Sequence, residues 1–210
     1  MPFLQGIYFP YSGGNNKGPM DIQEQKNVLR RELLQEIRSY PPEELARRSR
    51  NVAQNLKNLP QYKQANCIMF YYPLETEVNL LGIIRKALTQ KRVCFPVIDL
   101  ENGDLIPYEI NDLDKDFAAG PWGITQPDRE RARRTELQDI DLVVVPGLAF
   151  DRTRNRLGRG KGFYDKFLQK LAEKTANVGV AFDFQVISHV PSYPHKYEKV
   201  DALVTESFCI

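Results

Sequence analysis

Residues 142–166 read LVVVPGLAFDRTRNRLGRGKGFYDK, and this stretch predicts how the chain is organised. Its first residues, 142–145, form a short apolar run that ends at a Pro-Gly pair, as a buried strand does. A basic loop follows with three alternating glycines, Gly158, Gly160 and Gly162, and we expect a helix to start at the last of them. A strand that leads through such a loop into a helix is typical of phosphate binding, because backbone N–H groups and the helix dipole favour an anion.

Positive charge concentrates in the same stretch. Residues 147–166 contain six Lys or Arg against two Asp, whereas the whole chain has a formal net charge of only +2. The spacing is not that of a Walker A loop, because Lys161 is followed by Gly162, and alternating glycines do not match G-x-G-x-x-G. We interpret the loop as phosphate-binding, with a flexible solvated turn or a nucleic-acid-binding patch as the alternatives.

The composition is that of a soluble globular protein. With 42% hydrophobic and 27% charged residues, a chain of 210 residues predicts one domain with a full core. The near-neutral net charge argues against a general nucleic-acid binder. Cys67 and Cys94 lie in apolar runs, so we expect free thiols in a reducing cytosol. No apolar run approaches the roughly 20 residues of a membrane span, and no signal peptide is recognisable, so a cytoplasmic protein is expected.

The N-terminal part divides into an arm and a helix. Residues 1–19 are rich in Gly, Pro and Asn, and we expect a loose, dispensable arm before a single domain over residues 20–210. Apolar residues that recur every four positions predict a helix over residues 21–39. Lys26 and Arg30 share the face of that apolar stripe. They either reach back to water or point into an anion-binding pocket.

Strands alternate with helices from about residue 62 onward, which predicts parallel pairing with right-handed crossovers. An Asn-Gly turn signal predicts that one strand returns antiparallel to its neighbour. The expected strands cover 66–72, 92–97, 105–110 (the antiparallel return), 142–145, 177–182 and 202–205. Residues 111–139 are expected to be mostly loop.

The segment PGLAFDRTRNRLGRGKGFYDK resembles the signature of the 5-formyltetrahydrofolate cyclo-ligase family, also called methenyltetrahydrofolate synthetases, and the similarity runs from about residue 25 to residue 206. The resemblance implies a single α/β domain with a mostly parallel central sheet flanked by helices, related to the ribose-phosphate isomerase and CoA-transferase folds. It also implies ATP-dependent cyclisation of 5-formyltetrahydrofolate to 5,10-methenyltetrahydrofolate through a phosphorylated formyl group.

The family's nucleotide motif assigns ATP binding to two N-terminal cations, the glycine-rich loop and the helix start: Lys26, Arg30, Arg156, Leu157, Gly158, Arg159, Gly160, Lys161, Gly162, Phe163 and Tyr164. Lys161 and Arg159 are the expected catalytic residues, because cations stabilise charge on a transferred phosphoryl group. Mg²⁺ is expected at Asp165, with Asp201 as its partner. Alternatively, Asp165 only pairs with Arg156 or Lys161.

The resemblance assigns the reduced folate to Tyr72, Glu77, Trp122, Arg159 and Phe163. Glu77 follows a predicted strand, where α/β sheets bind ligands, although an acid at that point also suits a helix N-terminus. Trp122 either stacks on a flat ring or anchors packing. Phe163 stands where the family commonly has Tyr.

Two other function classes stay open. Departures from the family pattern at Asn79, Phe163 and Lys196 leave room for a non-catalytic folate-binding protein, which predicts no phosphate release. An RNA-binding module that uses residues 152–166 predicts salt-sensitive binding without ATP. Asp151 is interpreted as a loop anchor that accepts N–H bonds. The expected partner is a small reduced folate, with neither nucleic acid nor membrane, and we expect a monomer or weak dimer.

Overall fold

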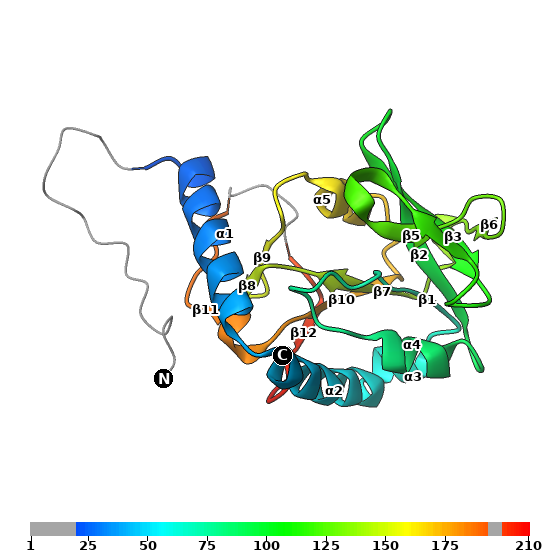
Figure 1. Ribbon diagram of the computed structural model, residues 1–210, viewed down its shortest axis with the longest axis horizontal. Coiled ribbons are helices and arrows are strands. Elements are labelled where there is room, and N and C mark those ends of the chain that lie inside the picture. The colour runs from blue at the N-terminus through cyan, green and yellow to red at the C-terminus, as the bar shows by residue number, and fades with distance from the viewer. Residues whose placement is uncertain (1–19, 193–198) are drawn as a thin grey trace, which may run out of the picture.

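A seven-stranded sheet forms the centre of the molecule (Figure 1). The computed structural model describes residues 20–192 and 199–210, so the arm predicted over residues 1–19 lies outside the described part. The strand order is β12-β10-β7-β1-β2-β3-β6, from β12 (Ala202–Val204), β10 (Ala176–Val180), β7 (Leu142–Pro146), β1 (Cys67–Met69), β2 (Arg92–Asp99), β3 (Asp104–Ile110) and β6 (Arg133–Arg134). The five strands from β12 to β2 pair in parallel. The strand β3 pairs antiparallel with β2, and β6 pairs antiparallel with β3. The predicted mostly parallel sheet is confirmed.

Both faces of the sheet are buried, which explains why its inner strands read as continuous apolar runs. In β7, Leu142 and Val144 belong to the core beneath α2 (Pro42–Asn58), α3 (Pro60–Gln64) and α4 (Leu81–Ala87). Val143 and Val145 belong to the opposite core, which contains Phe167 of the short helix α5 (Phe163–Leu168). Figure 1 shows α2, α3 and α4 on one side of the sheet and α5 on the other.

The helix α1 (Ile22–Ser39) begins as the sequence predicts, with the Asp21 side chain accepting a hydrogen bond from the Glu24 N–H at 2.7 Å. Its apolar stripe packs against a second, three-stranded sheet that the sequence reading missed. That sheet has the order β11-β8-β9, from β11 (Val186–Ile187), β8 (Ala149–Asp151) and β9 (Arg156–Leu157). The stretch after β7 therefore forms a β-hairpin before it becomes the glycine-rich loop.

Several predicted boundaries shift. The strand expected over residues 66–72 is shorter, since β1 covers only Cys67–Met69. Residues 111–139 contain short elements rather than loop alone: β4 (Phe117–Ala119), η1 (Pro121–Gly123), β5 (Thr125–Pro127), β6 and η2 (Leu137–Asp139). A third 3₁₀ turn, η3 (Asp183–Gln185), follows β10. The antiparallel return at residues 105–110 is confirmed in β3.

Cys67 and Cys94 are buried and free, as expected, and Cys209 is free and exposed. Among the helices of residues 20–192 and 199–210, none has the combination of length and apolarity that crossing a bilayer requires.

Candidate functional site

A cavity of about 330 Å³ opens beyond the carboxyl ends of the parallel strands. Tyr71 and Tyr72, just after β1, and Pro146 and Gly147, at the end of β7, lie along its floor. This is the edge of an open α/β sheet where ligands bind, because the strand ends leave a crevice between successive crossovers. The volume lies in the range of about 300 to 1,000 Å³ that is usual for small-ligand sites.

The glycine-rich loop closes one side of this cavity and rests on α1. The Arg30 Nε donates to the Gly158 carbonyl oxygen at 2.9 Å. Gly160 has φ +100°, a conformation that favours glycine, and a Cβ atom there would press on the Arg30 guanidinium carbon at 3.3 Å. Lys26 is buried on the same face of α1, which contradicts the alternative that it reaches back to water.

Arg156 is the most enclosed cation of the loop, with 4% of its surface exposed. It donates through Nη1 to the Pro146 carbonyl oxygen at 3.1 Å and forms an ion pair with Asp165 through Nη2. Its guanidinium also lies over the Tyr164 ring, 5.6 Å from the centroid. Burial raises the pKa of the Tyr164 hydroxyl, and the Glu77 carboxylate raises it further, so this phenol is neutral at physiological pH.

A second ion pair crosses the cavity. The Arg159 Nε donates to Glu77 Oε1 at 3.0 Å and its Nη2 donates to the Thr76 hydroxyl at 2.6 Å. The other Glu77 oxygen accepts a hydrogen bond from the Leu74 N–H at 3.1 Å, which holds the carboxylate within its own turn. Glu77 therefore faces the cavity and is not a cap of α4, which begins four residues later.

Trp122 lies at the mouth of the cavity on the tight turn between β4 and β5. Its backbone has φ +55°, a conformation that a bulky residue rarely adopts, and 60% of the side chain is exposed. The Lys161 ammonium lies 5.2 Å from the centroid of the Trp122 ring, and the Phe163 ring lies 6.2 Å away. So much exposure is incompatible with a packing anchor, and it leaves a flat aromatic face available beside the loop.

Most of the predicted site residues gather around this one cavity. Its lining includes the following members of the predicted set: Tyr72, Glu77, Trp122, Arg156, Gly158, Arg159, Lys161, Gly162, Phe163, Tyr164 and Asp165. Four of the residues predicted to bind ATP do not line it: Arg30 contacts the loop from α1, Gly160 lies in the loop against Arg30, Lys26 is buried on α1, and Leu157 is buried in the core beneath α1.

The prediction for Asp201 is corrected. Its carboxylate accepts hydrogen bonds from the backbone and side-chain nitrogens of Asn177, each at 2.8 Å, and it does not line the cavity. The physical reason is strand direction: Asp201 precedes β12, which runs parallel to β7, so it sits at the amino edge of the sheet while the cavity opens at the carboxyl edge. The structure does not bring Asp201 to Asp165.

The part of the lining that sequence reasoning missed is mostly apolar: Tyr71, Leu74, Phe95, Pro96, Ile98, Leu105, Ile124, Thr125, Pro146 and Gly147. The rule that ligands bind beyond strand ends would have found Pro146 and Gly147, since both follow the strand predicted over residues 142–145. The lining residues of β2 and β3 carry no comparable signal in the sequence, because they reach the cavity only through the position of the β2–β3 hairpin in the folded chain.

This arrangement can hold a flat ring between apolar side chains and aromatic rings, with anionic groups directed toward Arg156, Arg159 and Lys161. Within the described ranges no cluster of three or more His, Cys, Asp or Glu has metal-binding geometry. Mg²⁺ does not need one, because it is commonly held by one or two carboxylates together with phosphate oxygens. Asp165 has the right chemistry and lies beside the cationic loop.

Comparisons with known proteins agree with this geometry. Residues 22–206 match the 5-formyltetrahydrofolate cyclo-ligase family. The 5-formyltetrahydrofolate cyclo-ligase of Mus musculus is 30% identical over 195 residues, which cover 88% of this chain and 95% of the relative. The solution structure of 5,10-methenyltetrahydrofolate synthetase from Aquifex aeolicus superposes with a TM-score of 0.76 at 34% identity, over 88% of this chain and 91% of that one. The synthetase structure from Mycoplasma pneumoniae shares the fold, with a TM-score of 0.69 at 22% identity, over 86% of this chain and 98% of that one.

Proposed function

Because the chain belongs to the 5-formyltetrahydrofolate cyclo-ligase family, we propose that it converts 5-formyltetrahydrofolate to 5,10-methenyltetrahydrofolate at the cost of one ATP. The observation that carries this proposal is the cavity itself, where an apolar slot meets three cations of the glycine-rich loop. The slot suits a pterin ring, and the loop suits a triphosphate.

The chemistry needs ATP because the formyl oxygen is a poor leaving group. Transfer of the γ-phosphoryl group to that oxygen gives an imidoyl phosphate and ADP. Nitrogen 10 then attacks the activated carbon, and inorganic phosphate departs with the oxygen as the five-membered ring closes. The protein must therefore align the formyl oxygen with the γ-phosphate and neutralise charge on the transferred group.

The nucleotide side of the site is proposed to consist of the loop and its support. Arg159 and Lys161 reach the cavity and would stabilise the transferred phosphoryl group. Arg156 is already held by Pro146 and Asp165, so it presents a fixed charge with little reorganisation. Arg30 contributes by bonding the loop backbone at Gly158.

Asp165 is the residue proposed to hold Mg²⁺, which would neutralise phosphate oxygens when the metal nucleotide is bound. In the structure the Asp165 carboxylate forms an ion pair with Arg156, so a metal ion would compete with Arg156 for the same carboxylate.

The folate side is proposed to be formed by Tyr72, Glu77, Trp122 and Phe163. The carboxylate of Glu77 can accept hydrogen bonds from the amino and ring N–H groups of a pterin. Phe163 lacks the hydroxyl that relatives commonly have at this position, but its ring faces Trp122 and can pack on a flat substrate.

The test is an absorbance measurement. Purified protein is mixed with 5-formyltetrahydrofolate and Mg²⁺, with and without ATP, and the conjugated methenyl product is followed in the near ultraviolet together with ADP release. Growth of the band only with ATP, matched by ADP, supports the reaction. A flat trace from folded protein that still binds folate would refute it in favour of a non-catalytic folate binder.

A further inference from the structure

Gln185 is a buried amide outside the cavity that bonds three backbone groups at once. It ends η3, and only 1% of its surface is exposed. Its Oε1 accepts a hydrogen bond from the Phe182 N–H at 2.8 Å. Its Nε2 donates to the carbonyl oxygens of Gly147 at 3.2 Å and Leu148 at 3.1 Å. The primary amide is the neutral side chain that supplies one acceptor and two donors in this arrangement.

The segment that Gln185 bonds is the floor of the cavity. Gly147 lines the cavity, and its neighbour Pro146 accepts the hydrogen bond from Arg156. A Cβ atom at Gly147 would come within 2.6 Å of the Phe150 ring, so this position has no room for a side chain. Buried side chains thus hold the carbonyls of three consecutive residues, Pro146 to Leu148.

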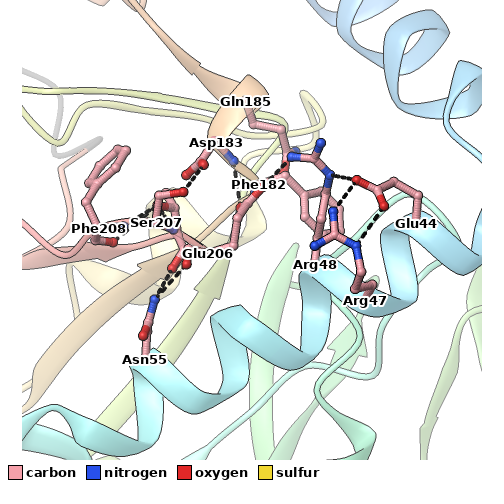
Figure 2. A network of polar contacts seen from close by, with 11 residues as sticks. Glu44, Arg47, Arg48, Asn55, Phe182, Asp183, Gln185, Glu206, Ser207 and Phe208 are labelled. Carbon is pink, nitrogen blue, oxygen red and sulfur yellow. Dashed lines mark hydrogen bonds and ion pairs between the residues drawn. The ribbon is translucent and has the colours of Figure 1, made fainter.

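The turn that presents Gln185 is itself anchored from its other side, in the network that Figure 2 shows. The Glu206 carboxylate, after β12, accepts from the Asp183 N–H at 2.8 Å and pairs with Arg48 of α2 at 2.6 Å. Asn55 of α2 donates to the Glu206 carbonyl oxygen at 3.1 Å. Hydrogen bonds and an ion pair thus connect α2 through Glu206 to the first residue of η3, and the last residue of η3, Gln185, bonds the cavity floor.

We propose that Gln185 is a positioning residue for the phosphoryl-transfer site: it fixes the backbone at Gly147, and thereby the Pro146 carbonyl that orients Arg156. It touches neither nucleotide nor folate in this scheme. The inference rests on the proposed function, because the loop that Arg156 supports is the proposed nucleotide site. Its consequence is that loss of the amide displaces the cation while leaving the folate residues Tyr72 and Glu77 in place.

The experiment compares Gln185→Met with Thr175→Val. Thr175 is a matched control, since its buried hydroxyl donates one hydrogen bond to the Ile140 carbonyl oxygen at 2.9 Å near the start of β10, at the amino edge of the sheet and away from the cavity. Both variants are assayed well below their melting temperatures. We expect Gln185→Met to lose about 10- to 100-fold in kcat/KM for ATP, the scale of a misplaced catalytic group, with folate binding changed less than about threefold. Thr175→Val should stay within about threefold of the unmodified chain.

A second variant keeps the test decisive if Gln185→Met fails to fold. Gln185→Glu is isosteric, and only its protonated carboxyl can both accept from Phe182 and donate to the carbonyls of Gly147 or Leu148. Its turnover relative to the unmodified chain should therefore rise as pH falls from about 8 to about 6, because burial among carbonyls favours the neutral acid.

Equal ATP kinetics in Gln185→Met and Thr175→Val would overturn the positioning role, as would a pH-independent ratio for Gln185→Glu. Inactivity of the unmodified chain would instead refute the proposed reaction. In that case the same variants are compared by ATP binding, where the positioning role predicts weaker affinity only for the Gln185 substitutions.

Discussion

Replacing Asp165 with Asn should destabilise the protein by more than replacing Arg156 with Met. The two groups form one ion pair, but they are buried unequally: Arg156 is 4% exposed and the Asp165 side chain 34%. Asp165→Asn leaves an enclosed guanidinium with neutral acceptors only, the Pro146 carbonyl oxygen and the amide oxygen of the new side chain, and with no counter-charge. Arg156→Met leaves a carboxylate that water can reach.

The expected loss of stability follows from the burial of the pair, which lies between a fully buried and a fully exposed ion pair. Breaking a fully buried pair by removing one partner costs about 3 to 5 kcal/mol, and exposed pairs contribute about 0 to 1 kcal/mol. We therefore expect Asp165→Asn to lose about 2 kcal/mol of stability, and the coupling energy between Arg156 and Asp165 to be of similar size. For a domain of this size, each kcal/mol lowers the melting temperature by about 2 to 4 °C, so Asp165→Asn should melt roughly 4 to 8 °C lower.

The assay is a double-mutant cycle by thermal denaturation, with the unmodified chain, both single variants and the double variant. Equal or greater destabilisation by Arg156→Met than by Asp165→Asn would refute the argument from unequal burial, and a coupling energy below about 0.5 kcal/mol would show that the pair contributes little. Repeating the cycle with the Mg²⁺ complex of ATP tests the second role of the carboxylate, since a ligand that binds only the folded state raises stability. If Asp165→Asn gains as much from the metal nucleotide as the unmodified chain does, Asp165 is not the metal ligand.

The remaining predictions concern four other features. Lys161→Ala should slow ATP-dependent turnover by about 100- to 1,000-fold as judged by the methenyl absorbance, and near-normal turnover in the folded variant would reject its role. Glu77→Gln removes the ion pair to Arg159 and should raise KM for folate more than KM for ATP in steady-state kinetics, and a selective rise for ATP would contradict the assignment. Burial raises the pKa of Asp151, but hydrogen bonds from Asn155, Val190 and Thr153 outweigh burial and hold it below its usual range. Its stabilising contribution is therefore present at neutral pH and lost as pH falls through the acidic range, so urea denaturation should show a shallower acid dependence in Asp151→Asn than in the unmodified chain. Deletion of residues 1–19 should leave turnover and solubility unchanged, and loss of either would show that the arm is needed.

Sequence patterns predicted those helices and strands that are determined by residues within the element itself. The apolar stripe of α1 and the apolar run of β7 each depend on residues within one element, and each appears where expected. The three-stranded sheet was missed because β9 and β11 have two residues each and show no periodicity. Asp151 was rightly read as a loop anchor, since its acceptors face N–H donors only two and four residues away.

Predicting the site residues requires the direction of each strand as well as the position of each residue along the chain. Asp165 and Asp201 look equivalent in the sequence, as acids beside predicted elements. Strand polarity separates them, because Asp165 lies on the helix that leaves the carboxyl edge, while Asp201 enters β12 from the amino edge. That distinction was available before the structure, since parallel pairing had already been predicted. The link from Gln185 to Gly147 was not, because it spans 38 positions and depends on where η3 turns back after β10. The glycine-rich loop is recognisable as a sequence motif, whereas Gln185 is a single amide, and a sequence alone does not distinguish a buried amide from an exposed one.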